Sequence, residues 1–217
     1  MGDFELILPE EKANYPLPFI KLCDRRTTLI EHDNTPCVIG LYVDIFPLDG
    51  TSSNIEEAAM LKRRYVRLWN KLEAISTRSS FTEHIALLAR PHEWGRFAVK
   101  TMAFFCRSTV RSLLLKKLDA ISRKYDYETS DTVIIYGGSY GEREIMPKTF
   151  CQGECIEMPF DGITILMPSG YKDYLTRIYG DYMQLPPEEK RVSHHYHAVL
   201  DLTKRLSDAD AIALLPR

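Results

Sequence analysis

The stretch VIGLYVDIFPLDG, residues 38–50, decides the fold, because it has the strongest strand pattern in the chain and carries a carboxylate inside it. Its side chains alternate between two faces of a predicted strand. One face holds Ile39, Leu41, Val43 and Ile45, and the other holds Tyr42, Asp44 and Phe46. An unpaired charge between two aromatic side chains is costly, so we expect Asp44 to have a partner. A cation or a metal ion compensates best for its lost hydration.

Short strands are also predicted before this stretch. Residues 19–23 (FIKLC) and 27–31 (TTLIE) are apolar or β-branched, and the short loops between the strands favour antiparallel pairing. Residues 1–15 are acidic and lead into a proline-rich segment, so we expect an irregular lead-in there. After the central strand, the pairs Phe46-Pro47 and Asp49-Gly50 predict a turn, in which Asp49 is a turn residue rather than a catalytic one.

A helical block follows, over about residues 54–126. Polar residues 51–54 offer N-caps for a helix over 55–75, and two further helices are predicted over 82–89 and 92–125, the last with a break near Ser108. The basic residues of the block are most simply a solvated face; a weaker alternative is attraction to an anionic membrane surface or polymer. They include Arg107, Arg111, Lys116, Lys117, Arg123 and Lys124.

The C-terminal half predicts strands and then helices. A strand over 131–136 precedes the glycine-rich residues 137–141, which favour a plain turn over a phosphate-binding loop. A turn at residues 160–162 leads into a strand over 163–167. Helices are expected over 171–178 and 187–206, and residues 207–217 are expected to be peripheral.

The composition is that of an ordinary globular protein. The 217 residues are 45% hydrophobic with a net charge of −2, and the basic residues are spread along the chain, so nucleic acid is not an expected partner. Five cysteines suggest free thiols in a reducing compartment rather than a disulfide framework. The N-terminus lacks the pattern of a secretory signal, and no apolar run is long enough to span a bilayer. We therefore expect a cytoplasmic location.

Three segments together resemble the LicD family. They are PFIKLCDRRTTLIE (residues 18–31), YVDIFPLDG (42–50) and GYKDYLTRIYGDYMQLPPEEKRVSHH (170–195). The resemblance implies a single domain over residues 1–217, with an α+β fold, a nucleotidyltransferase-like mixed or antiparallel sheet and the helical block as an insertion. It also implies transfer of phosphocholine from CDP-choline to a sugar of a cell-surface glycopolymer. Such an enzyme meets its polymer precursors at the inner face of the membrane, so a peripheral membrane contact is a further expectation.

The same resemblance implies a Mg²⁺ site in which Asp44 is a ligand. In that family an Asp-x-Asp pair on one strand joins a third carboxylate, and Val43-Asp44-Ile45 matches the third position. Several hard oxygen ligands are needed because Mg²⁺ neutralises the charge of a diphosphate. The Asp-rich motif is missing before residue 19, so the chain is expected to be N-terminally incomplete or a catalytically inactive remnant that serves as a binding module.

Further site residues come from position within the matched segments. The resemblance places Arg191, His194 and His195 near the active site, with the arginine on a phosphate and a histidine on the phosphate or the acceptor hydroxyl. Lys21 is a candidate for phosphate charge, although a lysine at a strand edge is commonly just solvated. The tyrosines of residues 171–182 invite an aromatic cage for a quaternary ammonium, but packing is the better prediction there.

Overall fold

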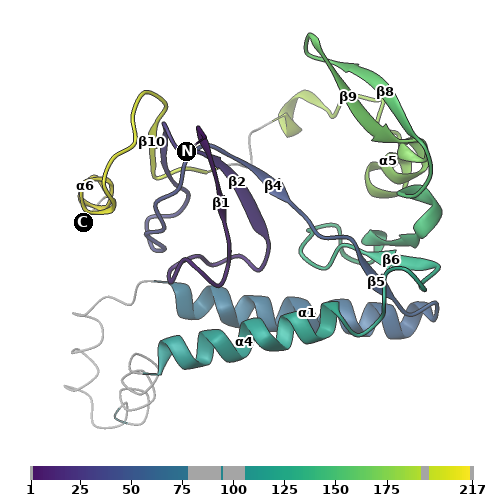
Figure 1. Cartoon of the computed structure of the whole chain (residues 1–217), viewed down its shortest axis with the longest axis horizontal. Coiled ribbons are helices and arrows are strands. Elements are labelled where there is room, and N and C mark those ends of the chain that lie inside the picture. The colour runs from purple at the N-terminus through teal and green to yellow at the C-terminus, as the bar shows by residue number, and fades with distance from the viewer. Residues whose placement is uncertain (1, 78–93, 95–105, 192–195, 216–217) are drawn as a thin grey trace. The chain divides into compact units, whose positions relative to one another are not determined.

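The computed structural model describes residues 2–77, 94, 106–191 and 196–215, and these form an α+β fold (Figure 1). The expected fold class is confirmed, and every strand pairing within the described residues is antiparallel. The chain divides into two compact units with separate sheets. Unit 1 holds Met1–Ile45, Arg67–Leu118 and Ser193–Arg217, and unit 2 holds Phe46–Val66 and Asp119–Val192.

Unit 1 contains a three-stranded sheet in the order β1-β2-β4, formed by β1 (Phe4–Ile7), β2 (Ile20–Asp24) and β4 (Tyr42–Ile45). The strand prediction for residues 19–23 is confirmed. The expectation of an irregular lead-in over residues 1–15 is wrong, because β1 pairs with β2 along its whole length. That pairing satisfies the backbone groups of β1 that face β2, and no local turn signal could have indicated it.

The central stretch keeps its predicted alternation, but the strand is shorter than expected. In β4 the half-buried face carries Tyr42 and Asp44, whereas Val43 and Ile45 are 67% and 41% exposed. The predicted turn at Asp49-Gly50 is wrong. These residues begin β5 (Asp49–Thr51), a strand of unit 2 that pairs with β6 (Thr132–Ile134).

A second sheet of unit 1 joins segments far apart in the sequence. β3 (Thr28–Ile30) pairs with β10 (Val199–Asp201), and α6 (Asp208–Ala213) packs nearby, with its N-terminus capped by Ser207. The expected helix over 187–206 and the expected peripheral tail are therefore wrong. The C-terminal segment supplies three of the five residues of a buried cluster, because its apolar side chains fill the space beside β3. The cluster consists of Ile30, Val38, Val199, Ala211 and Leu215.

Two helices make up the described part of the helical block. α1 (Ile55–Ser76) confirms the first predicted helix, and the side chain of Asn54 accepts hydrogen bonds from the backbone amides of its first turn. α4 (Arg107–Ser122) begins close to the predicted break. The predicted helix over residues 82–89 lies outside the described residues. Arg111 of α4 is not part of a solvated face: it is 7% exposed and donates to the carbonyl of Pro9 at 2.6 Å.

Unit 2 is built from two small sheets and a short helix. β5 and β6 continue into β7 (Ile145–Pro147), and β8 (Cys155–Phe160) pairs with β9 (Ile163–Pro168). The hairpin turn between β8 and β9 has positive φ at both Asp161 and Gly162, which suits the twist of the strands and confirms the predicted turn. α5 (Tyr171–Tyr179) confirms the predicted helix and is followed by Gly180 with φ of 75°.

Three short 3-10 helices complete unit 2: η2 (Gly141–Glu144), η3 (Lys148–Phe150) and η4 (Glu188–Lys190). The glycine-rich loop leads into η2, which is only four residues long, so its dipole is too small for a phosphate site. This supports the predicted plain turn.

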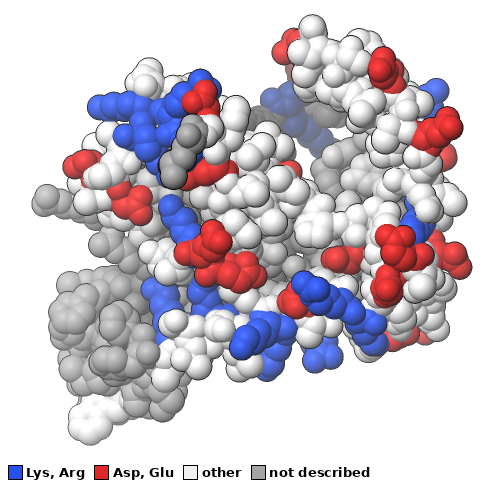
Figure 2. All heavy atoms as spheres, viewed as in Figure 1, with Lys and Arg blue, Asp and Glu red and all other residues white. Residues whose placement is uncertain are grey.

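In the part of the chain that the structure describes, no helix combines the length and the apolar character that a membrane span needs. On the face that Figure 2 shows, acidic side chains lie among the basic ones. Several basic residues of the helical block already have partners. Lys124 pairs with Glu57 at 2.6 Å, and Arg123 pairs with Asp119 at 2.7 Å.

Candidate functional site

The register of β2 and β4 sets the position of the candidate site in unit 1. Lys21 lies directly opposite Asp44, and Cys23 lies opposite Tyr42. Side chains at opposite positions of an antiparallel pair share one face of the sheet, and diagonal neighbours are within reach of long side chains. The Lys21 side chain is therefore held against both Asp44 and Tyr42.

A buried lysine is the centre of this site. Lys21 is only 1% exposed, and its Nζ lies 2.7 Å from Glu31 Oε2 and 3.7 Å from Asp44 Oδ1. The same Nζ lies 3.3 Å from the centre of the Tyr42 ring, which is a cation–π geometry. The expectation of a cation beside Asp44 is thus met by Lys21. We call this group of Lys21, Glu31, Tyr42 and Asp44 the Lys21 cluster.

The Lys21 cluster contains more negative than positive charge. Two carboxylates share one ammonium, and their side chains remain 24% (Glu31) and 28% (Asp44) exposed. Both acidic side chains are therefore partly exposed while the lysine is buried, although the Oδ1 atom of Asp44, which faces Lys21, is itself buried. Such an arrangement can accept hydrogen bonds or a further cation at its exposed side.

The tyrosine hydroxyls around the Lys21 cluster are held in their protonated form. Tyr42 donates its hydroxyl proton to Glu31 Oε1. Burial raises the pKa of Tyr42 well above its usual range, and the hydrogen bond to Glu31 and the nearby carboxylate charges raise it further. Burial, together with the charges of Asp44 and Glu31, also raises the pKa of Tyr15, whose hydroxyl donates to the carbonyl of Phe19. Both tyrosines therefore act as hydrogen-bond donors.

The described residues do not make a complete Mg²⁺ site. Within them, no three His, Cys, Asp or Glu side chains come close enough to hold a metal ion. Asp44 and Glu31 supply two carboxylates, but the Lys21 ammonium already compensates part of their charge. A Mg²⁺ ion bound through protein oxygens needs more hard ligands than this pair provides.

The structure brings together two of the five predicted site residues, Lys21 and Asp44. Arg191 belongs to unit 2, where it is exposed and its Nε donates to the carbonyl of Pro186 at 2.7 Å. His194 and His195 lie outside the described residues. Sequence reasoning missed Glu31 and Tyr42 as members of the site, although Tyr42 lies two positions before Asp44 on the same strand face.

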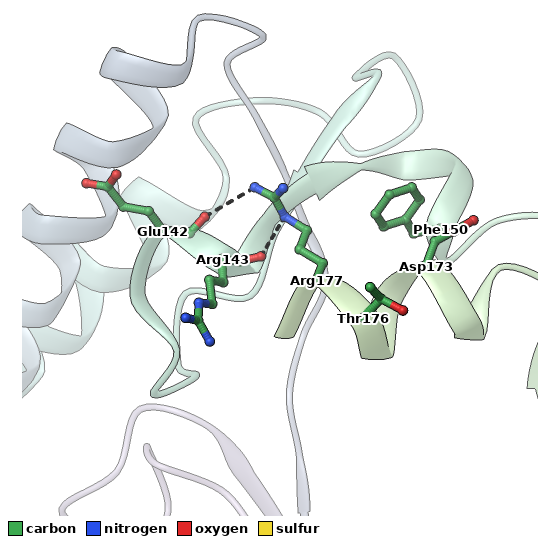
Figure 3. Close-up of a pocket in the computed structure, with 6 residues that line it drawn as sticks. All are labelled: Glu142, Arg143, Phe150, Asp173, Thr176 and Arg177. Atoms are coloured by element: carbon green, nitrogen blue, oxygen red, sulfur yellow. Dashed lines mark hydrogen bonds between the residues drawn. The ribbon is translucent and has the colours of Figure 1, made fainter. Parts of the chain in front are cut away.

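Unit 2 contains a separate hollow of about 560 Å³ beside α5 (Figure 3). We call it the α5 hollow. Asp173, Thr176 and Arg177 lie three and four residues apart, so they share one face of the helix. Residues from η2 and η3 complete the lining: Glu142, Arg143 and Phe150.

Two arginines fix the walls of the α5 hollow. Arg177 donates through Nε to the carbonyl of Arg143 at 2.8 Å and through Nη2 to the carbonyl of Glu142 at 3.5 Å (Figure 3). Arg143 in turn donates through Nη1 to the carbonyl of Ile178 at 3.0 Å. Each arginine thus binds the backbone of the segment that carries the other. Because a guanidinium has five N–H groups, each also keeps donors beyond these bonds.

A buried ion pair supports the loop that leads into η2. Lys62 of α1 is 3% exposed, and its Nζ donates to Glu144 Oε2 at 2.6 Å and to the carbonyls of Ile135, Tyr136 and Gly138. Burial lowers the pKa of Lys62, and the Glu144 carboxylate opposes that shift. A Cβ atom at Gly138 would lie 1.6 Å from Glu144 Oε1, so glycine is required at this position.

These observations define an α+β protein in which two partly exposed acidic side chains lie against a buried lysine. No family model matches the chain, and no solved structure matches it either. The chain is similar to the lipopolysaccharide cholinephosphotransferase LicD of Haemophilus influenzae, with 26% identity over 185 residues. The matched region covers 84% of this chain and 64% of the length of that relative. This similarity supports a LicD-like relationship.

Proposed function

We propose that the chain acts as a LicD-like phosphotransferase that moves phosphocholine from CDP-choline to a sugar hydroxyl of a cell-surface glycopolymer. The observation that carries this proposal is the similarity over 185 residues to a protein named as a lipopolysaccharide cholinephosphotransferase. In the proposed reaction the sugar oxygen forms a bond to the phosphocholine phosphorus, and the bond from that phosphorus to CMP breaks. The proton of the hydroxyl must leave to a base, so a carboxylate or a histidine is required near the acceptor.

The Lys21 cluster supports this proposal through its two partly exposed acidic side chains. Asp44 and Glu31 both lie against Lys21, and in the proposal their exposed side accepts a proton or binds a cation. Lys21 itself is buried and engaged, so it acts in this arrangement by positioning the two carboxylates. Roles for Arg191, His194 and His195 on the phosphates and the acceptor belong to the same proposal.

Mg²⁺ also remains part of the proposal, with Asp44 as one ligand. The ion would neutralise the charge of the diphosphate when bound. Because the described residues supply only two carboxylates beside Lys21, such a site needs ligands in addition to those that the structure brings together.

A second candidate function is a binding module that retains the fold without catalysis. The incomplete set of metal ligands among the described residues favours it. Such a module would bind the donor or the polymer and present it to another protein. The two candidates differ in one respect, since only the enzyme releases CMP.

One set of experiments tests both candidates. We expect the chain, mixed with CDP-choline, Mg²⁺ and a glycan acceptor, to release CMP, and the rate to fall at least about tenfold in Asp44→Asn. Asp3→Asn is the matched control, because Asp3 is an exposed carboxylate of unit 1 outside the Lys21 cluster. Calorimetry on the same proteins measures CDP-choline binding with and without Mg²⁺. Binding without CMP release contradicts the enzyme and supports the module. Absence of both binding and release contradicts the enzyme and a module that binds the donor.

A further inference from the structure

We propose that the α5 hollow binds the zwitterionic phosphocholine group, with its arginines on the phosphate and its Phe150–Asp173 side on the trimethylammonium. This inference rests on the proposed function for the choice of ligand. It assigns a binding site to unit 2, apart from the Lys21 cluster of unit 1. The ligand has an anionic end and a cationic end, so a complementary site must offer both kinds of partner a short distance apart.

The lining of the α5 hollow separates these two kinds of partner. Figure 3 shows the guanidinium groups of Arg143 and Arg177 on one side and the Phe150 ring and Asp173 on the other, with Thr176 between Arg177 and Asp173. The two arginines and Asp173 thus lie at opposite ends, and a second acidic residue, Glu142, lies at the arginine end. In the proposed orientation the phosphate lies at the arginine end and the trimethylammonium lies beside Phe150 and Asp173.

The arginine side suits a phosphate. Guanidinium groups bind phosphate oxygens through parallel hydrogen bonds, and Arg177 keeps further N–H groups after its two bonds to backbone carbonyls. Glu142 does not cancel this charge, because its carboxylate pairs with Arg63 Nη1 at 2.7 Å. The bonds to the backbone also hold the arginines in place before a ligand arrives, which lowers the entropic cost of binding.

The opposite side suits a quaternary ammonium. Such a group cannot donate a classical N–H hydrogen bond, so aromatic faces and nearby carboxylates are its usual partners. Phe150 supplies the aromatic ring and Asp173 supplies an exposed carboxylate. The tyrosine cage considered from the sequence does not form around this hollow, since Tyr174 packs against a buried cluster of Val133, Met146 and Ile178.

The size of the α5 hollow is compatible with a ligand of this class. Its volume of about 560 Å³ lies within the roughly 300–1,000 Å³ typical of small-molecule sites. The hollow is open, so the phosphocholine group can be bound while it remains attached to a larger molecule. Two sources fit the same chemistry: the donor CDP-choline, and a glycan that already carries phosphocholine.

Binding of phosphocholine to the full chain, measured by calorimetry or by NMR titration, tests this inference. Arg177→Gln removes the phosphate partner, and Lys172→Gln is its matched control on the same helix, because Lys172 is exposed and does not line the hollow. Asp173→Asn removes the carboxylate, with Asp181→Asn as its control. Phe150→Leu keeps an apolar side chain in the adjoining cluster but removes the ring.

We expect Arg177→Gln, Asp173→Asn and Phe150→Leu each to weaken phosphocholine binding by about three- to thirtyfold, and both controls to leave it unchanged. Phosphoethanolamine, which lacks the methyl groups, should bind more weakly and be insensitive to Phe150→Leu. Equal binding by all variants, or equal loss in the controls, overturns the inference. Circular dichroism and thermal unfolding of each variant identify losses that arise from misfolding, and Arg177→Lys then serves as a second, charge-conserving test.

Two further measurements separate the sources and the two proposals. If CDP-choline competes with phosphocholine in the α5 hollow and a phosphocholine-bearing saccharide does not, the source is the donor; the reverse result indicates the modified glycan. If the hollow binds phosphocholine but the chain releases no CMP, the enzyme proposal fails and this inference stands. If CMP is released at the same rate and phosphocholine binds equally well in all α5 variants, this inference fails and the enzyme proposal stands.

Discussion

Two buried lysines, Lys21 in unit 1 and Lys62 in unit 2, have similar burial and different surroundings. Their side chains are 1% and 3% exposed, and each lies within 2.7 Å of a glutamate oxygen. The glutamate partner of Lys62 is itself buried, with an exposed fraction of 4%. The Lys62 ammonium also donates hydrogen bonds to three backbone carbonyls. Lys21 instead has two carboxylate partners that are 24% and 28% exposed.

This difference separates a structural ion pair from a candidate functional one. The Lys62–Glu144 pair is enclosed by protein, so its groups can act only on the fold. The acidic side chains of the Lys21 cluster are partly exposed, so a substrate or a cation can approach their exposed side while Lys21 contacts them from the buried side. The exposed fraction of the carboxylate side chains, rather than that of the lysine, therefore distinguishes the two sites.

Lys62→Met should give the largest effect on stability. The substitution leaves Glu144 buried without its cation, and breaking a buried ion pair in this way costs about 3–5 kcal/mol. Urea unfolding followed by circular dichroism measures this cost. Arg63→Gln is the matched control, since Arg63 and Glu142 form a pair whose side chains are 60% and 59% exposed. A Lys62→Met cost below that of the control would show that the enclosed pair does not support unit 2.

Substitutions in the Lys21 cluster should have smaller effects on stability than Lys62→Met. The effect should be larger for the carboxylate that lies closer to Lys21 Nζ. Glu31→Gln removes the charge at 2.7 Å from Lys21 Nζ and should cost about 1.5–3 kcal/mol, because hydrogen bonds between charged groups are worth that much. Asp44→Asn changes the contact at 3.7 Å and should cost less than about 1 kcal/mol. The same unfolding measurement ranks the two variants, and an equal or reversed ranking would show that Asp44 rather than Glu31 anchors the lysine.

The elements that could be predicted from the sequence are those with a local cause. α1 has its cap at Asn54, the hairpin of β8 and β9 has its Asp161-Gly162 turn, and α5 stops at Gly180. β1 and β10 were missed because each is a short strand whose partner lies elsewhere in the chain. The pairing of Leu200 with Leu29, for instance, has no signature in either segment alone.

The candidate site also has features with a local sequence cause and features that depend on distant segments. Alternation within one strand was enough to predict that Asp44 needs a cation or a metal ion. The identity of the cation depended on the register between β2 and β4, which places Lys21 opposite Asp44. Glu31 was missed as a site residue because its position depends on where β3 ends relative to the other sheet, and no local pattern encodes that relation.

A third acidic group, Asp49 of β5, extends the comparison because no described lysine forms an ion pair with it, although the charge of Arg123 partly opposes the shift of its pKa. Its side chain hydrogen-bonds with Ser122, and burial raises its pKa above the usual 3.8, with the charge of Asp119 adding to the shift. A raised pKa in the folded state means that protonation favours folding. This contribution is therefore fully present below the ordinary pKa and is lost as the pH rises through the folded value.

Asp49→Asn should accordingly flatten the acid side of the stability profile. Asparagine stays neutral and can still accept from Ser122, so the variant should be at least as stable as the parent at neutral pH and should lose the pH dependence that Asp49 contributes. Thermal unfolding at a series of values from about pH 3 to pH 7 measures this change. Asp131→Asn, at an exposed position of unit 2, is the control. A profile that runs parallel to that of the parent at lower stability would show that the Ser122 hydrogen bond, rather than burial of the charge, dominates at this position.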